Sequence, residues 1–286
     1  MKKSRGLIAV IVVILLIAAA CAALYLYNEY LNSHITVKEY TCRSSELPES
    51  FDGFKIFVIS DLHNAPFSGQ IITEISNAQP DVIVFTGDMV QLPDHDLSEA
   101  VRIAKTFEGK IPVYAVSGNH EQQSEAFWNI YDSFQYSGGV HWLEDESVTI
   151  KRYDDAITLI GLADPMHNTL GAEDYELACQ KIAENTENSA AFSVLLNHRA
   201  TMYSAIKDTD VDLILSGHLH GGIIQLPFVG RMIGEHGTVE FPEDVYGEVK
   251  HGNGAEMIVS GGCDQNPQKK RWFNQPEVLV IRLKRE

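Results

Sequence analysis

Five short polar blocks, each directly after an apolar run, constrain this chain more than any other feature. The blocks are Asp61-Leu62-His63, Gly87-Asp88, Gly118-Asn119-His120-Glu121, Asn197-His198 and Gly217-His218-Leu219-His220. The runs before them are typical of buried strands and cover residues 55–59, 81–85, 113–116, 192–196 and 212–215. Because open α/β sheets bind ligands at the carboxyl ends of their strands, the blocks predict one shared site.

Segments with helical spacing separate the predicted strands. They cover residues 70–78, 97–107, 125–136 and 173–184, and further strands are predicted over 35–41 and 157–162. After His220, short apolar segments at 223–226, 238–241, 256–259 and 278–283 alternate with Gly and Pro. We expect these last segments to form a closing antiparallel layer on an α/β domain.

The amino terminus predicts a membrane anchor. Leu7 to Tyr27 is an uncharged run of 21 residues, and a helix of that length spans roughly 31 Å, close to the ~30 Å bilayer core. Three basic residues precede it, which favours a cytoplasmic amino end. We therefore expect a single-pass anchor at about 7–27, a connector to residue 33, and an extracytoplasmic domain over 34–286.

A cleaved signal peptide is the alternative for this segment. Its apolar core is usually about 7–15 residues long, shorter than this run. Residues 18–21, Ala-Ala-Ala-Cys, place small side chains before a cysteine, as at a lipoprotein cleavage site, but the apolar run continues past Cys21. Either reading exports the domain to the outer face of the cell membrane.

Charge argues against one class of protein, and the cysteine content leaves disulfide formation undecided. Beyond the three basic residues that precede Leu7, the chain has 19 basic against 39 acidic residues, which disfavours nucleic-acid binding. One basic and aromatic cluster, residues 269–273, fits contact with a phosphorylated substrate or anionic headgroups, or a solvated loop. Cys42, Cys179 and Cys263 form no CxxC pair, so a bridge among them stays open.

The first two blocks offer carboxylate and imidazole ligands. On an extended segment Asp61 and His63 would share one face and reach one cation. The alternative is that Asp61 caps a helix while His63 lies in a loop. Asp88 follows Gly87, and its two carboxylate oxygens can bridge two cations, although Gly-Asp alone is common in turns.

The later blocks add an amide and more imidazoles. Asn119 offers a neutral oxygen, and His120 beside it would face the substrate, unless the pair is only a turn. His198 follows a predicted strand. His218 and His220, two apart on an expected extended segment, would share a face, and the glycines around them leave room for a phosphate. If each of the five blocks were only a turn, their ligand-type residues would follow the strands by coincidence. One shared metal site is the more economical explanation.

The block order D-x-H, GD, GNH, H, GHxH resembles the calcineurin-like metallophosphoesterase superfamily over about residues 55–283. The segments Leu226-Pro227-Phe228, Tyr246-Gly247 and Asn274-Gln275-Pro276-Glu277 are similar to its membrane-anchored bacterial branch, the YkuE and YaeI type. This resemblance implies a layered αββα sandwich, in which two mixed β-sheets are flanked by helices.

The resemblance also implies a ligand set. Asp61, His63 and His220 would hold one metal, Asn119, His198 and His218 a second, Asp88 would bridge them, and His120 would act at the leaving oxygen. Mixed oxygen and nitrogen ligands suit two divalent ions such as Mn, Fe or Zn. Gln91 and Ile223 depart from residues common in the family, and these departures concern the substrate.

The implied activity is hydrolysis of a phosphodiester or phosphoanhydride by a metal-bridging hydroxide. Membrane anchoring is compatible with a lipid-linked envelope substrate as well as with a phosphorylated small molecule. A broad phosphomonoesterase uses the same dimetal core and is the first alternative. A membrane-tethered metal-binding module without turnover is the second, and the intact His120 argues against it.

Overall fold

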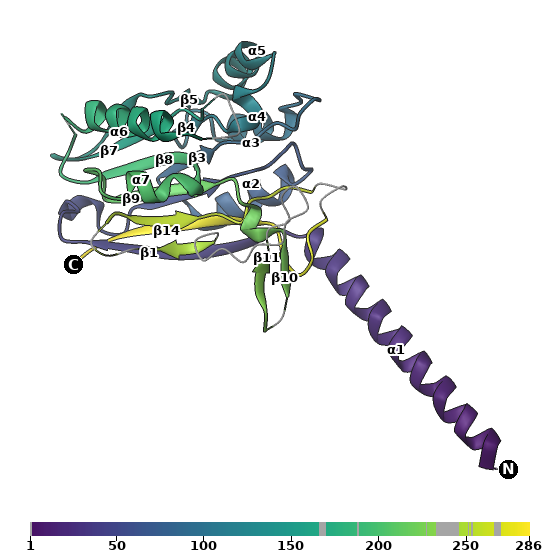
Figure 1. The fold of residues 1–286 in the computed structure, drawn as a ribbon. Helices are drawn as coiled ribbons and strands as arrows, with labels where there is room; N and C mark the ends of the chain where they lie inside the picture. Colours follow the sequence, from purple (N-terminus) through teal and green to yellow (C-terminus); the bar gives the residue numbers. More distant parts are fainter. Residues whose placement is uncertain are drawn as a thin grey trace.

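The computed structural model describes residues 2–165, 170–187, 189–226, 228–232, 246–250, 252, 254–265 and 270–286. Within these residues two six-stranded mixed sheets pack face to face (Figure 1). The strand order of the first sheet is β1 (Thr36–Ser44), β14 (Glu277–Arg285), β2 (Lys55–Ile59), β3 (Val82–Thr86), β4 (Val113–Val116) and β5 (His141–Trp142). The order of the second sheet is β12 (Gly247–Val249), β13 (Glu256–Val259), β9 (Leu213–Gly217), β8 (Ser193–Arg199), β7 (Asp155–Leu162) and β6 (Ser147–Arg152).

Helices cover the outer faces of the two sheets. The helices over the first sheet are α2 (Ser68–Ala78) and α3 (Ser98–Phe107), and a π-helical turn at Ser133–Ser137 packs against the same cluster. Those over the second are α6 (Ala172–Thr186) and α7 (Tyr203–Ile206). The short helices α4 (Asn119–Gln122) and α5 (Phe127–Asp132) follow β4, and the hairpin of β10 (Ile224–Leu226) and β11 (Gly230–Met232) projects from the sandwich. The predicted αββα sandwich is confirmed.

The alternation within β2 shows how the strands are held in register. Ile56 and Val58 belong to the apolar cluster between the two sheets, whereas Phe57 and Ile59 pack against the helical layer. All four side chains are buried, and each contributes about 1.5–3 kcal/mol relative to an exposed position. A shift of one residue would exchange the two faces, so packing fixes where the chain leaves the strand at residue 60.

We expected the carboxyl-terminal strands to form a separate antiparallel layer, and this prediction is wrong for β13 and β14. β14 inserts between β1 and β2, parallel to the first and antiparallel to the second, and β13 pairs parallel to β9. Residues 278–281, Val-Leu-Val-Ile, are all buried, and such a continuous apolar run suits a central strand that is covered on both faces. The predicted strand at 238–241 lies outside the described residues.

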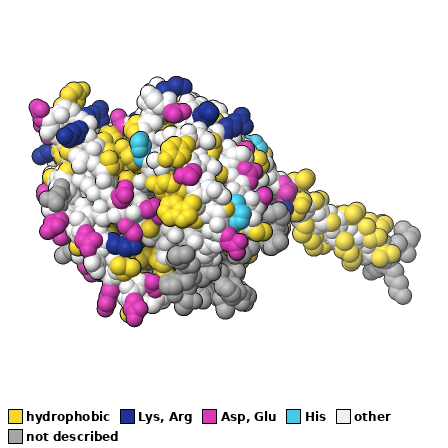
Figure 2. All heavy atoms as spheres, turned by 90° about the horizontal axis from the view of Figure 1, so that it is seen from above, with side chains coloured by type: hydrophobic (Ala, Val, Ile, Leu, Met, Phe, Trp, Pro, Cys, Tyr) yellow, Lys and Arg dark blue, Asp and Glu magenta, His cyan; other side chains and the backbone are white. Residues whose placement is uncertain are grey.

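The amino-terminal segment is the single helix α1 (Lys2–Asn32). Its stretch Gly6–Asn32 is long and apolar enough to cross a membrane and lies outside the packed core. Figure 2 shows it standing clear of the domain with apolar side chains around it. The helix continues through residues 28–32, where we expected a connector. All four cysteines are free, and Cys42 and Cys263 are buried.

Candidate metal centre

The five polar blocks meet where strands of both sheets end. Asp61, Asp88 and Asn119 follow β2, β3 and β4 of the first sheet, His198 lies near the end of β8, and His218 follows β9 of the second. The strands run parallel within each set, so their carboxyl ends meet at one edge. The sequence prediction that these blocks form one site agrees with this arrangement.

The local backbone differs from the extended form that we expected. Asp61 and His63 have φ angles of 49° and 46°, and Asp88, His218 and His220 have 58°, 74° and 48°. Left-handed angles at non-glycine residues cost of order 1–3 kcal/mol each and persist where surrounding contacts impose them. The Asp61 amide donates to the Gly87 carbonyl and the His63 amide to the Asp88 carbonyl, both at 3.0 Å, and these bonds hold the first two residues in place.

Two glycines of the blocks are required by close packing. A Cβ atom at Gly118 would overlap the carboxylate of Asp88, and one at Gly217 would overlap Ser60 and the carboxylate of Asp61. These two glycines therefore let the chain after β4 approach Asp88 and the end of β9 approach Asp61. This packing explains the GN and GH pairs without reference to a bound phosphate.

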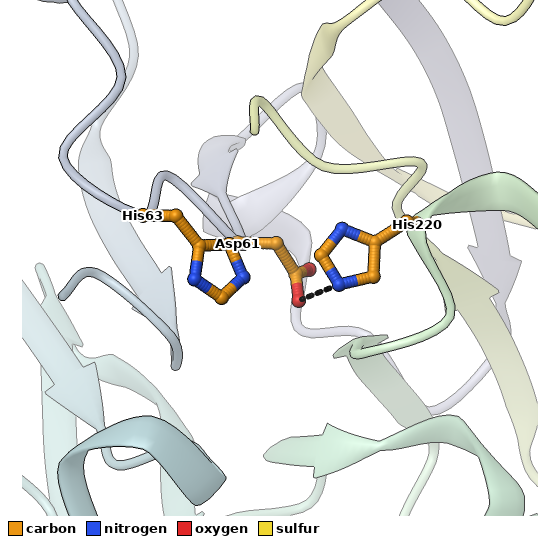
Figure 3. A group of neighbouring side chains, drawn as sticks. All are labelled: Asp61, His63 and His220. Carbon is orange, nitrogen blue, oxygen red and sulfur yellow. Dashed lines mark ion pairs between the residues drawn. The ribbon is translucent and has the colours of Figure 1, made fainter. Parts of the chain in front are cut away.

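Asp61, His63 and His220 form the first cluster (Figure 3). One ligand atom from each lies within 4.8 Å of the others. The Asp61 carboxylate is buried and accepts hydrogen bonds from Ser60 Oγ at 2.5 Å and from the His218 amide at 3.1 Å. His220 Nε2 lies 3.8 Å from Asp61 Oδ1, which leaves room for a cation between them.

Asp88 lies between this cluster and a second one. Its Oδ2 atom is 3.7 Å from His63 Nε2 and 3.3 Å from His198 Nε2. Asp88, His198 and His218 form another group of possible ligands, and Asn119 Oδ1 lies 3.2 Å from His198 Nε2. His218 and His220 therefore belong to different clusters and do not share the face that we expected from their spacing.

The imidazoles of His63 and His198 turn Nε2 toward this space, which fits a metal. His63 Nδ1 lies 3.1 Å from the Val90 carbonyl and His198 Nδ1 lies 2.8 Å from that of Thr86. A carbonyl only accepts, so each Nδ1 donates, and in the neutral ring each Nε2 has its lone pair free for a cation. His63 Nε2 is buried without a hydrogen-bond partner, and burial lowers the pKa of His63 to about 4.

The charges at the centre are those of a cation site. Burial opposes ionisation of Asp88, yet His198 beside it holds the pKa of Asp88 well below its usual value. Burial likewise disfavours a charged His198, but Asp88 raises the pKa of that imidazole to about 10. In the metal-free protein the proton on His198 thus balances the carboxylate, and a metal ion would replace it.

His120 is oriented differently from the other imidazoles. Its Nδ1 accepts a hydrogen bond of 3.1 Å from the Leu92 amide, so the neutral ring carries its proton on Nε2. That Nε2 lies 4.0 Å from Asp88 Oδ2, and burial lowers the pKa of His120. A ring that presents N–H to the centre suits donation to a substrate better than coordination of a cation.

Sequence reasoning missed the role of Glu121. The side chain is fully buried, and its carboxylate accepts the amides of Asp88 and Gly118, each at 2.8 Å, and those of Met89 and Val90 at 2.7 and 3.0 Å. It thereby links the loop that carries Asp88 to the loop that carries Asn119. Its position three residues after Gly118, where a capping residue bonds back to the helix start, was the available signal.

Asp264 and Arg271 were also missed as partners of the centre. Asp264 Oδ1 lies 2.9 Å from His220 Nδ1, and Arg271 Nε donates to the same oxygen at 2.8 Å. Arg271 is only 3% exposed, so this part of the cluster at 269–273 is not a solvated loop. A carboxylate behind a metal-binding histidine orients the ring and raises its basicity.

Two cavities lie beside residues that neighbour the centre, although none of the candidate ligands nor His120 lines either one. One of about 580 Å³ is lined by Gln122 and Asp164 and by the aromatic side chains of Phe127, Trp128 and Tyr131. The other, of about 370 Å³, lies between the end of α1 and the pair Asp264 and Arg271.

Comparison with known proteins agrees with the fold and the centre. The family model for calcineurin-like phosphoesterases matches residues 54–222, which include every block described above. The chain belongs to this family. It is 34% identical to the metallophosphoesterase YkuE of Bacillus subtilis (strain 168) over 275 residues, which cover 91% of this chain and 90% of YkuE.

Two other relatives carry informative names. UDP-2,3-diacylglucosamine pyrophosphatase LpxG of Chlamydia muridarum is 22% identical, over 82% of this chain and 86% of LpxG. A bovine transmembrane protein with metallophosphoesterase domain is 29% identical, over 62% of this chain and 43% of that protein. Family and geometry together indicate a phosphoesterase with a divalent metal centre, and α1 indicates association with a membrane.

Proposed function

We propose that this protein is a membrane-anchored, dimetal-dependent phosphoesterase that hydrolyses a phosphodiester or phosphoanhydride bond. The observation that carries the proposal is the position of Asp88, whose Oδ2 lies between His63 and His198 at 3.7 and 3.3 Å. One carboxylate shared by two groups of imidazoles is the arrangement that a pair of divalent ions requires. Asp61, His63 and His220 would hold one ion, and Asn119, His198 and His218 the other.

Two such ions would supply a water-derived nucleophile near neutral pH and hold the phosphoryl oxygens. The chain itself orients the ligands through carbonyls of the adjacent loops and through Asp264. His120 Nε2–H faces the same space, so it would donate a hydrogen bond or proton to the leaving oxygen.

A lipid-linked substrate is our choice within this class. The end of α1 is connected to the centre through two residues, because Asn28 bonds to Arg271, Arg271 pairs with Asp264, and Asp264 contacts His220. The centre therefore lies close to where the anchor leaves the membrane. The similarity to LpxG, named a diacylglucosamine pyrophosphatase, points in the same direction. With the amino end cytoplasmic, the domain would act on the outer face.

The proposal is tested with the full chain in detergent micelles, first stripped of metal and then loaded with Mn²⁺. We expect Mn²⁺-dependent hydrolysis of bis-p-nitrophenyl phosphate that exceeds hydrolysis of p-nitrophenyl phosphate. Turnover confined to the monoester would favour the broad phosphomonoesterase. Two bound ions without turnover of either ester would favour a narrow natural substrate or the non-catalytic module. Lipid-linked pyrophosphates in mixed micelles then test the substrate class.

His120→Asn should lower kcat by about 10²–10⁴-fold without loss of bound metal, because it removes a donor and not a ligand. The measurement is steady-state hydrolysis together with metal content per chain. His141→Asn, the same change at an exposed position of β5, is the matched control and should leave both values unchanged. Loss of one metal ion from His120→Asn would instead make His120 a ligand.

A further inference from the structure

The carboxyl end of α1 binds one segment of the catalytic domain, residues 270–274, which we call the Arg271 segment. Asn28 is fully buried, unlike the apolar residues that precede it in the helix. Its Nδ2 donates to the carbonyl of Arg271 at 3.0 Å, and its Oδ1 accepts the amide of Phe273 at 2.7 Å. Both ends of one amide side chain are thus paired with the backbone of residues 271–273.

Further contacts stabilise the same interface between α1 and the Arg271 segment. Asn32, one helical turn after Asn28, donates to the Arg271 carbonyl at 3.0 Å. Lys270 forms an ion pair with Glu29, and its ammonium lies 4.7 Å from the ring centroid of Tyr25. These contacts involve polar side chains at the end of an otherwise apolar helix. They fix the position of the segment relative to the anchor.

The Arg271 segment also contacts the residues that surround His220 of the metal centre. Arg271 donates from Nε to Asp264 Oδ1 at 2.8 Å and from Nη2 to the Gly261 carbonyl at 2.7 Å. Asp264 Oδ1 contacts His220 Nδ1 at 2.9 Å, and Asn274 Nδ2 donates to the His220 carbonyl at 2.7 Å. Both the ring and the backbone of His220 are therefore held by residues of the segment or by their partners.

We propose that Asn28 is a positioning residue for the metal centre, so that α1 is a structural support of the His220 site as well as an anchor. Asn28 holds the Arg271 backbone, Arg271 orients Asp264, and Asp264 orients the His220 ring toward Asp61. The inference rests on the proposed role of His220 as a metal ligand, but it does not depend on which ester the protein hydrolyses.

The test is a Mn²⁺ titration of the full chain in detergent micelles. Binding is monitored through the electron paramagnetic resonance signals of free and paired Mn²⁺. Asn28→Ala should weaken one of the two sites by about 10-fold, the lower end of the range for loss of an outer-shell partner. The paired-ion signal should fall accordingly at limiting Mn²⁺.

Gln70→Ala is the matched control. Gln70 on α2 also uses both ends of its amide, to the Ile35 amide at 3.0 Å and the Ser33 carbonyl at 3.1 Å, but it does not touch the Arg271 segment. Its Mn²⁺ affinities should stay within about twofold of wild type, since sites with no shared partner act independently. Equal weakening in both variants would overturn the proposal in favour of general loosening of the interface between α1 and the domain.

A double-mutant cycle with Asp264→Asn tests the route. If Asn28 acts through Asp264, the double variant should bind Mn²⁺ no more weakly than Asp264→Asn alone. Additive losses would overturn this route, and wild-type affinity for both ions in Asn28→Ala would overturn the proposal. Hydrolysis is not the readout, so a chain that binds Mn²⁺ in this way without turnover would contradict only the phosphoesterase function.

Discussion

Asp88→Asn should lower the rate of hydrolysis by about 10³-fold or more. It should also prevent the protein from holding two metal ions. Loss of one stabilising donor in an active site costs about 10²–10³-fold, and Asp88 serves both clusters at once. The substitution keeps the shape of the side chain and the Oδ1 that accepts the His120 amide at 2.8 Å. It removes the negative charge that His63 and His198 face.

Thermal unfolding in increasing Mn²⁺ separates loss of metal from loss of fold. A ligand at 100 times its Kd stabilises the native state by about 2.7 kcal/mol per site. The wild-type Tm should therefore rise by several degrees, and that of Asp88→Asn much less. Asp94→Asn, the same change at an exposed position of the following loop, should behave like wild type. An Asp88→Asn protein with two ions and undiminished turnover would contradict the proposed bridging role.

The location of the centre could be predicted from the sequence because it depends on a local rule. Apolar runs form the strands, and polar residues just after them must lie at the strand ends. Asp61, Asp88, Asn119, His198 and His218 all follow this rule. The rule holds whatever the strand order, so it did not require the correct placement of β13 or β14.

The orientation of the ligands could not be predicted in the same way. Alternation describes extended chain, whereas Asp61, His63 and His220 adopt left-handed angles that neighbouring loops impose. His218 and His220 therefore separate into two clusters despite their spacing. Conformations set by contacts with distant segments leave little trace in a local pattern.

The supports of the centre were hidden for a related reason. Arg271 stands in a basic and aromatic cluster that suggested a surface function, and only its pairing with Asp264 shows that it is buried. Asp264 in turn meets His220, which is 44 positions earlier in the chain. Such long-range pairs determine which charges are neutralised, and residue type alone does not reveal them.

Glu121→Gln is expected to be the most destabilising conservative change at the centre. The carboxylate accepts four backbone amides, two on each oxygen. A glutamine keeps one oxygen and turns an NH₂ group toward the other two donors. Each buried donor left unsatisfied costs about 1–3 kcal/mol, so we expect a loss of about 2–6 kcal/mol in the free energy of unfolding.

The neighbouring charge of Asp88 opposes this loss in part. Burial and Asp88 together raise the pKa of Glu121 to about 7, so the neutral glutamine removes a repulsion as well as the oxygen that accepts two of the amides. The amides remain the larger factor because all four point at the carboxylate over 2.7–3.0 Å. Chemical denaturation of the metal-free protein measures the balance, with Glu125→Gln, an exposed position nearby, as the control expected within about 0.5 kcal/mol of wild type.

The same substitution should also reach the metals. Glu121 joins the loop that carries Asp88 to the loop that carries Asn119, so its loss lets the bridging ligand and a ligand of the second cluster move apart. We expect weaker Mn²⁺ binding in Glu121→Gln even under conditions where the variant is fully folded. A folded variant with wild-type Mn²⁺ affinity would mean that strand packing alone, through β3 and β4, holds the two loops in register.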